Sequence, residues 1–138
     1  DVLDWLLATI KEASKNKDVL WLLKPHPAEK WYGGLTLEET IKGKLPSNII
    51  LLPDDYSGKA VMDVADALVT IHGTSAIEYA AHGKPVLVAD KGWFQDSNFV
   101  FYINFLLDFL FHTVVFFYNW RLRQNVVIYL LIVNLHSY

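Results

Sequence analysis

Four apolar runs, without regular alternation of polar residues, divide the first 90 residues of the chain. They are Val19 to Leu23, Asn48 to Leu52, Ala67 to Ile71 and Pro85 to Ala89. Runs of this kind indicate strands that are buried on both faces of a parallel sheet. Because helix-like segments separate them, the pattern predicts an α/β fold, a Rossmann-like parallel sheet flanked by helices.

The segments between the runs carry helical signals. Apolar residues at helical spacing predict an amphipathic helix over residues 2–15. Thr36 predicts the start of a shorter helix that ends near Gly43, and residues 59–65 predict a third helix. A Rossmann-like half opens with a strand, whereas this chain enters a helix directly. We therefore expect its first strand to be missing and the chain to be a fragment.

The turn after the third run is the most informative stretch of the chain. Gly73 allows the backbone to approach a ligand closely, and Thr74 and Ser75 lie where the first free amides of a helix attract anions. Ser75 and Glu78 also fit a capping box, in which each side chain satisfies an orphan amide of the first turn. Ligand binding and simple helix capping are therefore both open for these residues.

Each run ends in a polar cluster, and the parallel arrangement places all of these clusters at the carboxyl edge of the predicted sheet. In open α/β sheets this edge forms the ligand crevice. We therefore expect six residues to converge on one site: His26, Asp54, His72, Gly73, Thr74 and Asp90.

Structural roles are the alternative for several residues near this edge. His26 lies between two prolines and also fits a stiff loop, and the His72 ring also fits a bond to a neighbouring backbone carbonyl. Lys84 fits the protein surface better than the site. Asp54 and Asp55 fit a turn better than a metal-binding pair.

Three segments together resemble a known family. They are Lys24-Pro25-His26-Pro27-Ala28-Glu29, Asp66 to Thr70, and His72 to Ala81 with Gly83-Lys84-Pro85-Val86. In combination they look like the carboxyl-terminal donor-binding domain of GT-B glycosyltransferases, above all that of bacterial capsular polysaccharide biosynthesis proteins and their glycerophosphotransferase relatives. The likeness covers roughly residues 1–97.

This resemblance implies a nucleotide-sugar or CDP-polyol donor as substrate, a glycan acceptor as partner, and neither a metal nor another cofactor. It places Gly73, Thr74 and Ser75 against the donor phosphates, Glu78 against the ribose hydroxyls, and His26 in the same crevice. The full donor-binding set is expected to be His26, His72, Gly73, Thr74, Ser75 and Glu78. The catalytic base is expected on a separate amino-terminal domain, so no residue of this chain is assigned that role.

The composition excludes several other classes of protein. The chain has no cysteine, which excludes thiol catalysis, disulfides and cysteine-ligated zinc and permits a cytoplasmic location. It has no metalloprotease histidine spacing, Walker phosphate loop, glycine-rich dinucleotide fingerprint or Gly-x-Ser-x-Gly elbow. Its net charge of -3 offers no basic field for nucleic acid.

Residues 98–138 differ in composition from everything before them. They contain no Gly, Pro, Ala, Glu or Lys, yet hold seven of the eight Phe residues and both Arg residues of the chain. Three interpretations are open: translation in a shifted reading frame, association with the inner face of a membrane, or helices packed on the sheet. We therefore divide the chain into a partial nucleotide-sugar-binding domain, residues 1–97, and an apolar aromatic tail, residues 98–138.

The sequence as a whole indicates a fragment of a transferase that moves a sugar or a polyol phosphate from a nucleotide-activated donor to a capsular polysaccharide. Two other functions fit the same residues. One is a nucleotide-sugar epimerase of GT-B-like fold, which acts without an acceptor. The other is a noncatalytic domain, either degenerate or associated with a membrane.

Overall fold

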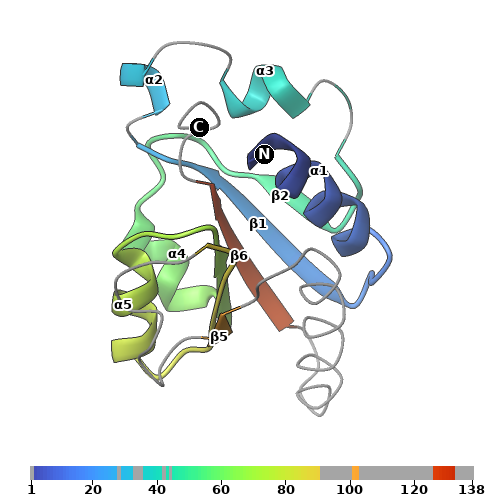
Figure 1. Cartoon of the computed structure of the whole chain (residues 1–138). Coiled ribbons are helices and arrows are strands. Elements are labelled where there is room, and N and C mark those ends of the chain that lie inside the picture. The colour runs from blue at the N-terminus through green and yellow to red at the C-terminus, as the bar shows by residue number, and fades with distance from the viewer. Residues whose placement is uncertain are drawn as a thin grey trace.

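The computed structural model describes residues 2–27, 29–32, 36–41, 43, 45–90, 101–102 and 126–132. They form an α/β fold in which helices lie on both faces of a parallel sheet (Figure 1). The strands are β1 (Val19–Pro25), β2 (Ile49–Leu51), β3 (Ala67–Thr70), β4 (Val86–Val88), β5 (Phe101–Tyr102) and β6 (Val126–Ile132). The helices are α1 (Val2–Ala13), α2 (Glu29–Tyr32), α3 (Leu37–Ile41), α4 (Gly58–Val64) and α5 (Ser75–Ala81).

The sheet has the strand order β2-β1-β6-β3-β4-β5, and all of its neighbouring strands are parallel. Each of the four apolar runs forms a strand, as the sequence predicts: β2, β3 and β4 lie within their runs, and β1 extends two residues beyond its run to Pro25. All four residues of β3 and all three of β4 are buried. A strand covered on both faces has no side that benefits from polar residues, which explains the unbroken apolar runs.

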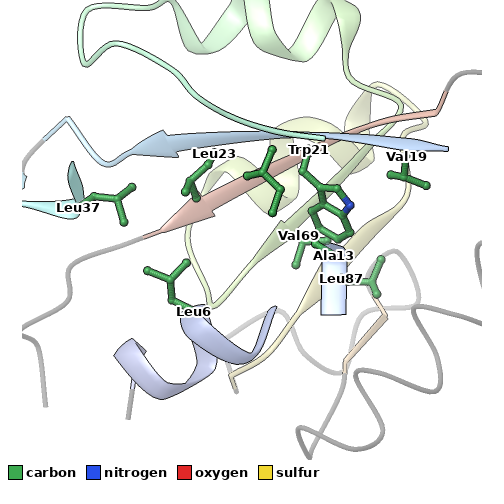
Figure 2. Packing of buried hydrophobic residues seen from close by; sticks show 9 residues of the cluster. Leu6, Ala13, Val19, Trp21, Leu23, Leu37, Val69 and Leu87 are labelled. Atoms are coloured by element: carbon green, nitrogen blue, oxygen red, sulfur yellow. The ribbon is translucent and has the colours of Figure 1, made fainter. Parts of the chain in front are cut away.

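One apolar core lies between the sheet and the pair α1 and α3. Leu6 and Ala13 of α1 face the strands, and the Trp21 and Leu23 side chains of β1 lie among them (Figure 2). The buried members of this core are Leu6, Ala13, Val19, Trp21, Leu23, Leu37, Ile49, Val69 and Leu87. They come from strands on both sides of β6, so this layer holds the two halves of the sheet together.

A second apolar core lies on the opposite face, under α4 and α5. Its buried members are Leu22, Val61, Met62, Ala65, Leu68, Ala76, Tyr79, Val86 and Val88. Leu22 and Leu23 are neighbours in β1 and point into different cores, as the alternation of side chains along a strand requires. The helices therefore cover both faces, and the polar clusters remain at the strand ends.

Three helices agree with the sequence prediction apart from small differences at their ends. α1 ends at Ala13, slightly before the predicted residue 15. α3 ends at Ile41, and Gly43 after it has a φ of 138°, which favours glycine. α4 begins after Ser57, whose hydroxyl accepts a hydrogen bond from the Ala60 amide at 3.4 Å.

A capping box forms at α3 and not at α5. The Glu39 amide donates to the Thr36 hydroxyl at 3.2 Å, and the Thr36 amide donates to the Glu39 carboxylate at 2.7 Å. In α5 the N-cap residue is Thr74, and Ser75 is already inside the helix. The predicted capping box of Ser75 and Glu78 is therefore wrong, because its serine lies one residue beyond the cap position.

Strand β6 comes from the apolar tail and lies in the middle of the sheet. It pairs with β1 from Val126 opposite Val19 to Ile132 opposite Pro25, and with β3 on its other side. The interpretation of the tail as packed helices is wrong for residues 101–102 and 126–132, which are strands. The rest of the tail lies outside the described residues, and no described helix is long and apolar enough to cross a membrane.

Candidate functional site

The turn between β3 and α5 lies at the carboxyl edge of the sheet. Gly73 in this turn has a φ of 132°, a conformation that side chains with a Cβ rarely adopt. The Gly73 carbonyl accepts a hydrogen bond from the Ala76 amide at 3.2 Å, and the Thr74 carbonyl accepts from the Ile77 and Glu78 amides at 3.0 and 3.2 Å. Backbone bonds alone therefore close the first turn of α5.

Three polar side chains of this turn have no bonding partner in the described part of the chain. Among the described residues, the hydroxyls of Thr74 and Ser75 and the carboxylate of Glu78 form no hydrogen bond or ion pair. Thr74 and Glu78 are exposed, and Ser75 is half-buried. Two hydroxyls and a carboxylate thus stand free beside a glycine that permits close approach, and can bond a polar ligand.

His72 and Asp90 border the same turn. The His72 Nδ1 atom lies 3.5 Å from Oδ2 of Asp90, which is longer than a normal hydrogen bond, and both side chains are partly exposed. The Asp90 amide donates to the Ile71 carbonyl at 2.9 Å, which extends the pairing of β3 and β4 past the strand ends. This backbone bond fixes Asp90 beside the turn.

A second polar group lies at the carboxyl end of β1 and is centred on a buried lysine. Lys24 is only 3% exposed, and its Nζ atom donates a hydrogen bond to the Asp54 carbonyl at 3.0 Å. Burial lowers the pKa of Lys24, and the nearby carboxylates of Asp54 and Asp55 oppose that shift. Lys24 thus places an ammonium group at the strand edge, a feature missing from the predicted set.

His26 belongs to the group around Lys24. Burial lowers the pKa of its imidazole, and the Lys24 ammonium lowers it further. His26 is therefore more often neutral near pH 7 than an exposed histidine. The signal in the sequence that would have found Lys24 is its place as the first charged residue after an apolar run, directly before Pro25-His26-Pro27.

Strand β6 separates the two polar groups. Lys24 in β1 and Thr70 in β3 both pair with Leu131, one strand away on either side, so their Cα atoms lie about 10 Å apart. Side chains alternate along strands, so Lys24 and Thr70 are on the same face as Leu22 and Leu68, the face that α4 and α5 cover. The two groups therefore follow strands that end at the same edge of the sheet, and the last residue of β3 has its side chain on the same face as Lys24.

The predicted residues thus fall into two sets. His72, Gly73, Thr74 and Asp90 surround the turn after β3, together with Ser75 and Glu78 of α5. His26 and Asp54 lie with Lys24 at the end of β1. In the part of the chain that the structure describes, no three histidine, aspartate or glutamate side chains are grouped so that they could hold a metal ion.

Lys84 lies outside the site, and its prediction as a surface residue is wrong. It is half-buried, and its ammonium donates to the carbonyls of Met62 and Ala65, the latter at 2.6 Å. These two carbonyls are at the end of α4, where a helix leaves its last carbonyl groups without partners. Lys84 therefore fixes the end of α4 against the segment that enters β4.

Comparison with known proteins gives no match to a family model, a curated protein or a solved structure. The fold and the polar residues at the carboxyl edge of the sheet are therefore the features of this chain that bear on its function.

Proposed function

We propose that the chain is the donor-binding part of a GT-B-type transferase that moves a sugar or a polyol phosphate from a nucleotide-activated donor to a surface polysaccharide. The turn between β3 and α5 is the observation that carries this proposal. It combines a glycine in a conformation open to close approach with hydroxyl and carboxylate groups that bond to none of the described residues. It also lies at the edge where parallel α/β sheets bind their ligands.

Each residue of the turn has a role in this proposal. The backbone at Gly73 and the hydroxyls of Thr74 and Ser75 bind the donor phosphates, and Glu78 accepts hydrogen bonds from the ribose hydroxyls. A carboxylate suits this second role because a ribose offers two O–H donors side by side. The nucleotide then lies along the start of α5, with its phosphates at the turn.

The group at the end of β1 supplies positive charge to the same ligand. When the bond between the phosphate and the transferred group breaks, negative charge grows on the departing nucleotide. The Lys24 ammonium and a hydrogen bond from His26 stabilise that charge from the other side of β6. The catalytic base lies outside this domain, so its residues bind and orient the donor. The proposal places the protein in the cytoplasm, at the inner face of the membrane.

Titration of the full chain with CDP, UDP and GDP, followed by calorimetry, tests the proposal. At least one of the three nucleotides should bind. Glu78→Ala should weaken its binding about tenfold or more, because a hydrogen bond to a charged group contributes about 1.5–3 kcal/mol. The matched control is Glu38→Ala, which removes an exposed carboxylate from the first turn of α3, a helix whose core lies on the opposite face of the sheet from that of α5.

A second pair of variants tests the backbone of the turn. Gly73→Val forces a β-branched residue into a positive φ and should abolish nucleotide binding. Gly58→Val is its control, because a Cβ added at Gly58 meets no atom within 4 Å. Unchanged affinity in folded Gly73→Val and Glu78→Ala proteins would refute the assigned site. Absence of binding by the unaltered chain would refute the function and favour a noncatalytic domain.

A further inference from the structure

The last described strand, β6, occupies the position in this sheet that the first strand takes in a doubly wound sheet. Such a sheet, built from two βαβαβ halves, has the order 3-2-1-4-5-6. Here β2 and β1 occupy places 3 and 2, and β3, β4 and β5 occupy places 4, 5 and 6. Strand β6 occupies the remaining place, between β1 and β3, and is parallel to both of them.

The direction of α1 is the one expected for a helix that links a strand in that position to β1. A short turn joins the end of α1 to the start of β1, so α1 runs back along the sheet and begins at the carboxyl edge (Figure 1). Strand β6 is parallel to β1 and ends at that same edge. In space, β6, α1 and β1 therefore have the arrangement of a βαβ unit, in which a helix links two adjacent parallel strands.

The position between β1 and β3 fits a strand for two reasons: the backbones of β1 and β3 pair with it, and apolar cores lie on both of its faces. All seven residues of β1 are in register with β6, and all four residues of β3 are in register with it on the other side. β1 and β3 each turn backbone N–H and C=O groups toward this place. The apolar cores above and below contain Leu23 and Val69 on one face and Leu22 and Leu68 on the other. An occupant must therefore be extended, parallel and apolar on both faces.

We propose that the position between β1 and β3 is a strand-acceptor site, and that the partner it fits is an apolar parallel strand that leads directly into α1. Strand β6 occupies the site in this chain by the same backbone pairing, and is replaceable. Main-chain hydrogen bonds on both sides provide the affinity, as in strand addition to a sheet edge, while the two cores select an apolar sequence. This inference does not depend on nucleotide binding.

Replacement of β6 within the full chain tests the proposal. Tyr129 is the middle residue of β6 and pairs with Leu22 and Leu68. Tyr129→Pro removes a ladder N–H from a central strand, and should lower the melting temperature by about 10 °C or more, or abolish cooperative unfolding. In a second variant, the Tyr129→Pro chain carries an intact copy of residues 126–132 ahead of Val2, joined by a linker of about four residues, a usual length for α/β loops.

The attached copy should restore cooperative unfolding to within a few degrees of the parent, and its amides should resist hydrogen exchange along with those of β1 and β3. The control carries the same attachment with proline at the position equivalent to Tyr129, and should restore nothing. Two results would overturn the proposal. One is unchanged unfolding of the Tyr129→Pro chain, and the other is failure of the intact attached copy to restore folding.

Discussion

At the residue scale, the polar side chains of the carboxyl edge differ in whether they bond to other described residues of the fold. Lys24 is buried and bonded to the Asp54 carbonyl, and its charge acts on His26. Thr74 and Glu78 carry no such bond within the described part of the chain. We therefore expect substitution of the first kind of group to alter interactions within the fold, and substitution of the second kind to leave the folding stability nearly unchanged.

The buried environment of His26 makes folding stability depend on pH. Its pKa in the folded chain is below the ordinary 6.5, so below about pH 6.5 the unfolded chain binds more protons than the folded one. The contribution of His26 is therefore complete above about pH 6.5 and is lost as the pH falls toward the folded pKa. Urea unfolding should show that His26→Gln loses less stability than the parent between about pH 7 and pH 5.

The same pair of proteins supplies the control for His26. Between about pH 7 and pH 8 the imidazole is mostly neutral in both states, so the stability difference between the variant and the parent should stay constant. Equal losses in the two proteins between about pH 7 and pH 5 would contradict the lowered pKa of His26.

Under the proposed function, we expect the Lys24 side chain to matter more for charge recognition than for stability. Lys24→Met keeps the apolar stem and removes an ammonium whose burial is costly, so the free energy of unfolding should change by no more than about 1 kcal/mol. Affinity for a nucleoside diphosphate should fall about tenfold, while affinity for the nucleoside should not change. Lys11→Met, on the exposed side of α1, is the matched control for calorimetry. Equal losses for both ligands would place Lys24 outside the phosphate site.

At the scale of the elements, a buried amide joins α1, β1 and β2. The Asn48 Nδ2 atom donates to the carbonyls of Ala13, Asn16 and Val19, at 2.9, 3.0 and 3.2 Å. Lys17 donates to its Oδ1 atom at 3.1 Å. The carbonyls of Ala13 and Asn16 otherwise accept only long backbone bonds of 3.4 Å, from the Asn16 and Val19 amides, so this one side chain strengthens the junction between the end of α1 and the start of β1.

Removal of this amide should destabilise the fold. Asn48→Ala removes the side-chain hydrogen bonds that join these segments, and should lower the free energy of unfolding by about 1–3 kcal/mol in urea titration. Asn16→Ala provides the comparison, because the Asn16 side chain makes an exposed bond to the Asp18 amide, and should cost less than about 1 kcal/mol. A cost for Asn48→Ala no greater than that of Asn16→Ala would contradict the role of the amide.

The helices and strands also show which structural features the sequence pattern could predict. Strands β1 to β4 were predictable because unbroken apolar runs, bounded by turn residues, are typical of strands covered on both faces. The start of α5 was displaced by one residue, because Thr74 and Ser75 are both good cap residues and pattern alone cannot choose between them. The burial of Lys24 could not be predicted, because burial depends on which loop covers a strand end.

Strand β6 was not predictable for a different reason. The segment around it contains no glycine or proline, so no turn signal marks where Val126–Ile132 begins or ends. Its neighbours in the sheet are distant in sequence, and pairing of this kind leaves no local trace. The candidate site followed from strand ends and turn chemistry alone, whereas the strand between its two halves required the structure.

At the scale of the whole molecule, the two halves of the sheet unfold together if β6 and both cores link them. One core joins Leu23 of β1 to Val69 of β3, and the other joins Leu22 to Leu68 across the opposite face. Neither half has a complete core by itself. Chains of this size with shared cores unfold in a single transition.

Substitutions on opposite faces should therefore shift the same transition. Leu23 and Leu68 are fully buried, and replacement of either by alanine should cost about 2–5 kcal/mol. Far-UV circular dichroism and tryptophan fluorescence should report one common urea midpoint in each variant. Ile50→Ala, at a 46% exposed site on the edge strand β2, should cost less than about 1 kcal/mol. A variant in which the two signals separate would show that β2 and β1 unfold apart from β3, β4 and β5, and that β6 does not couple them.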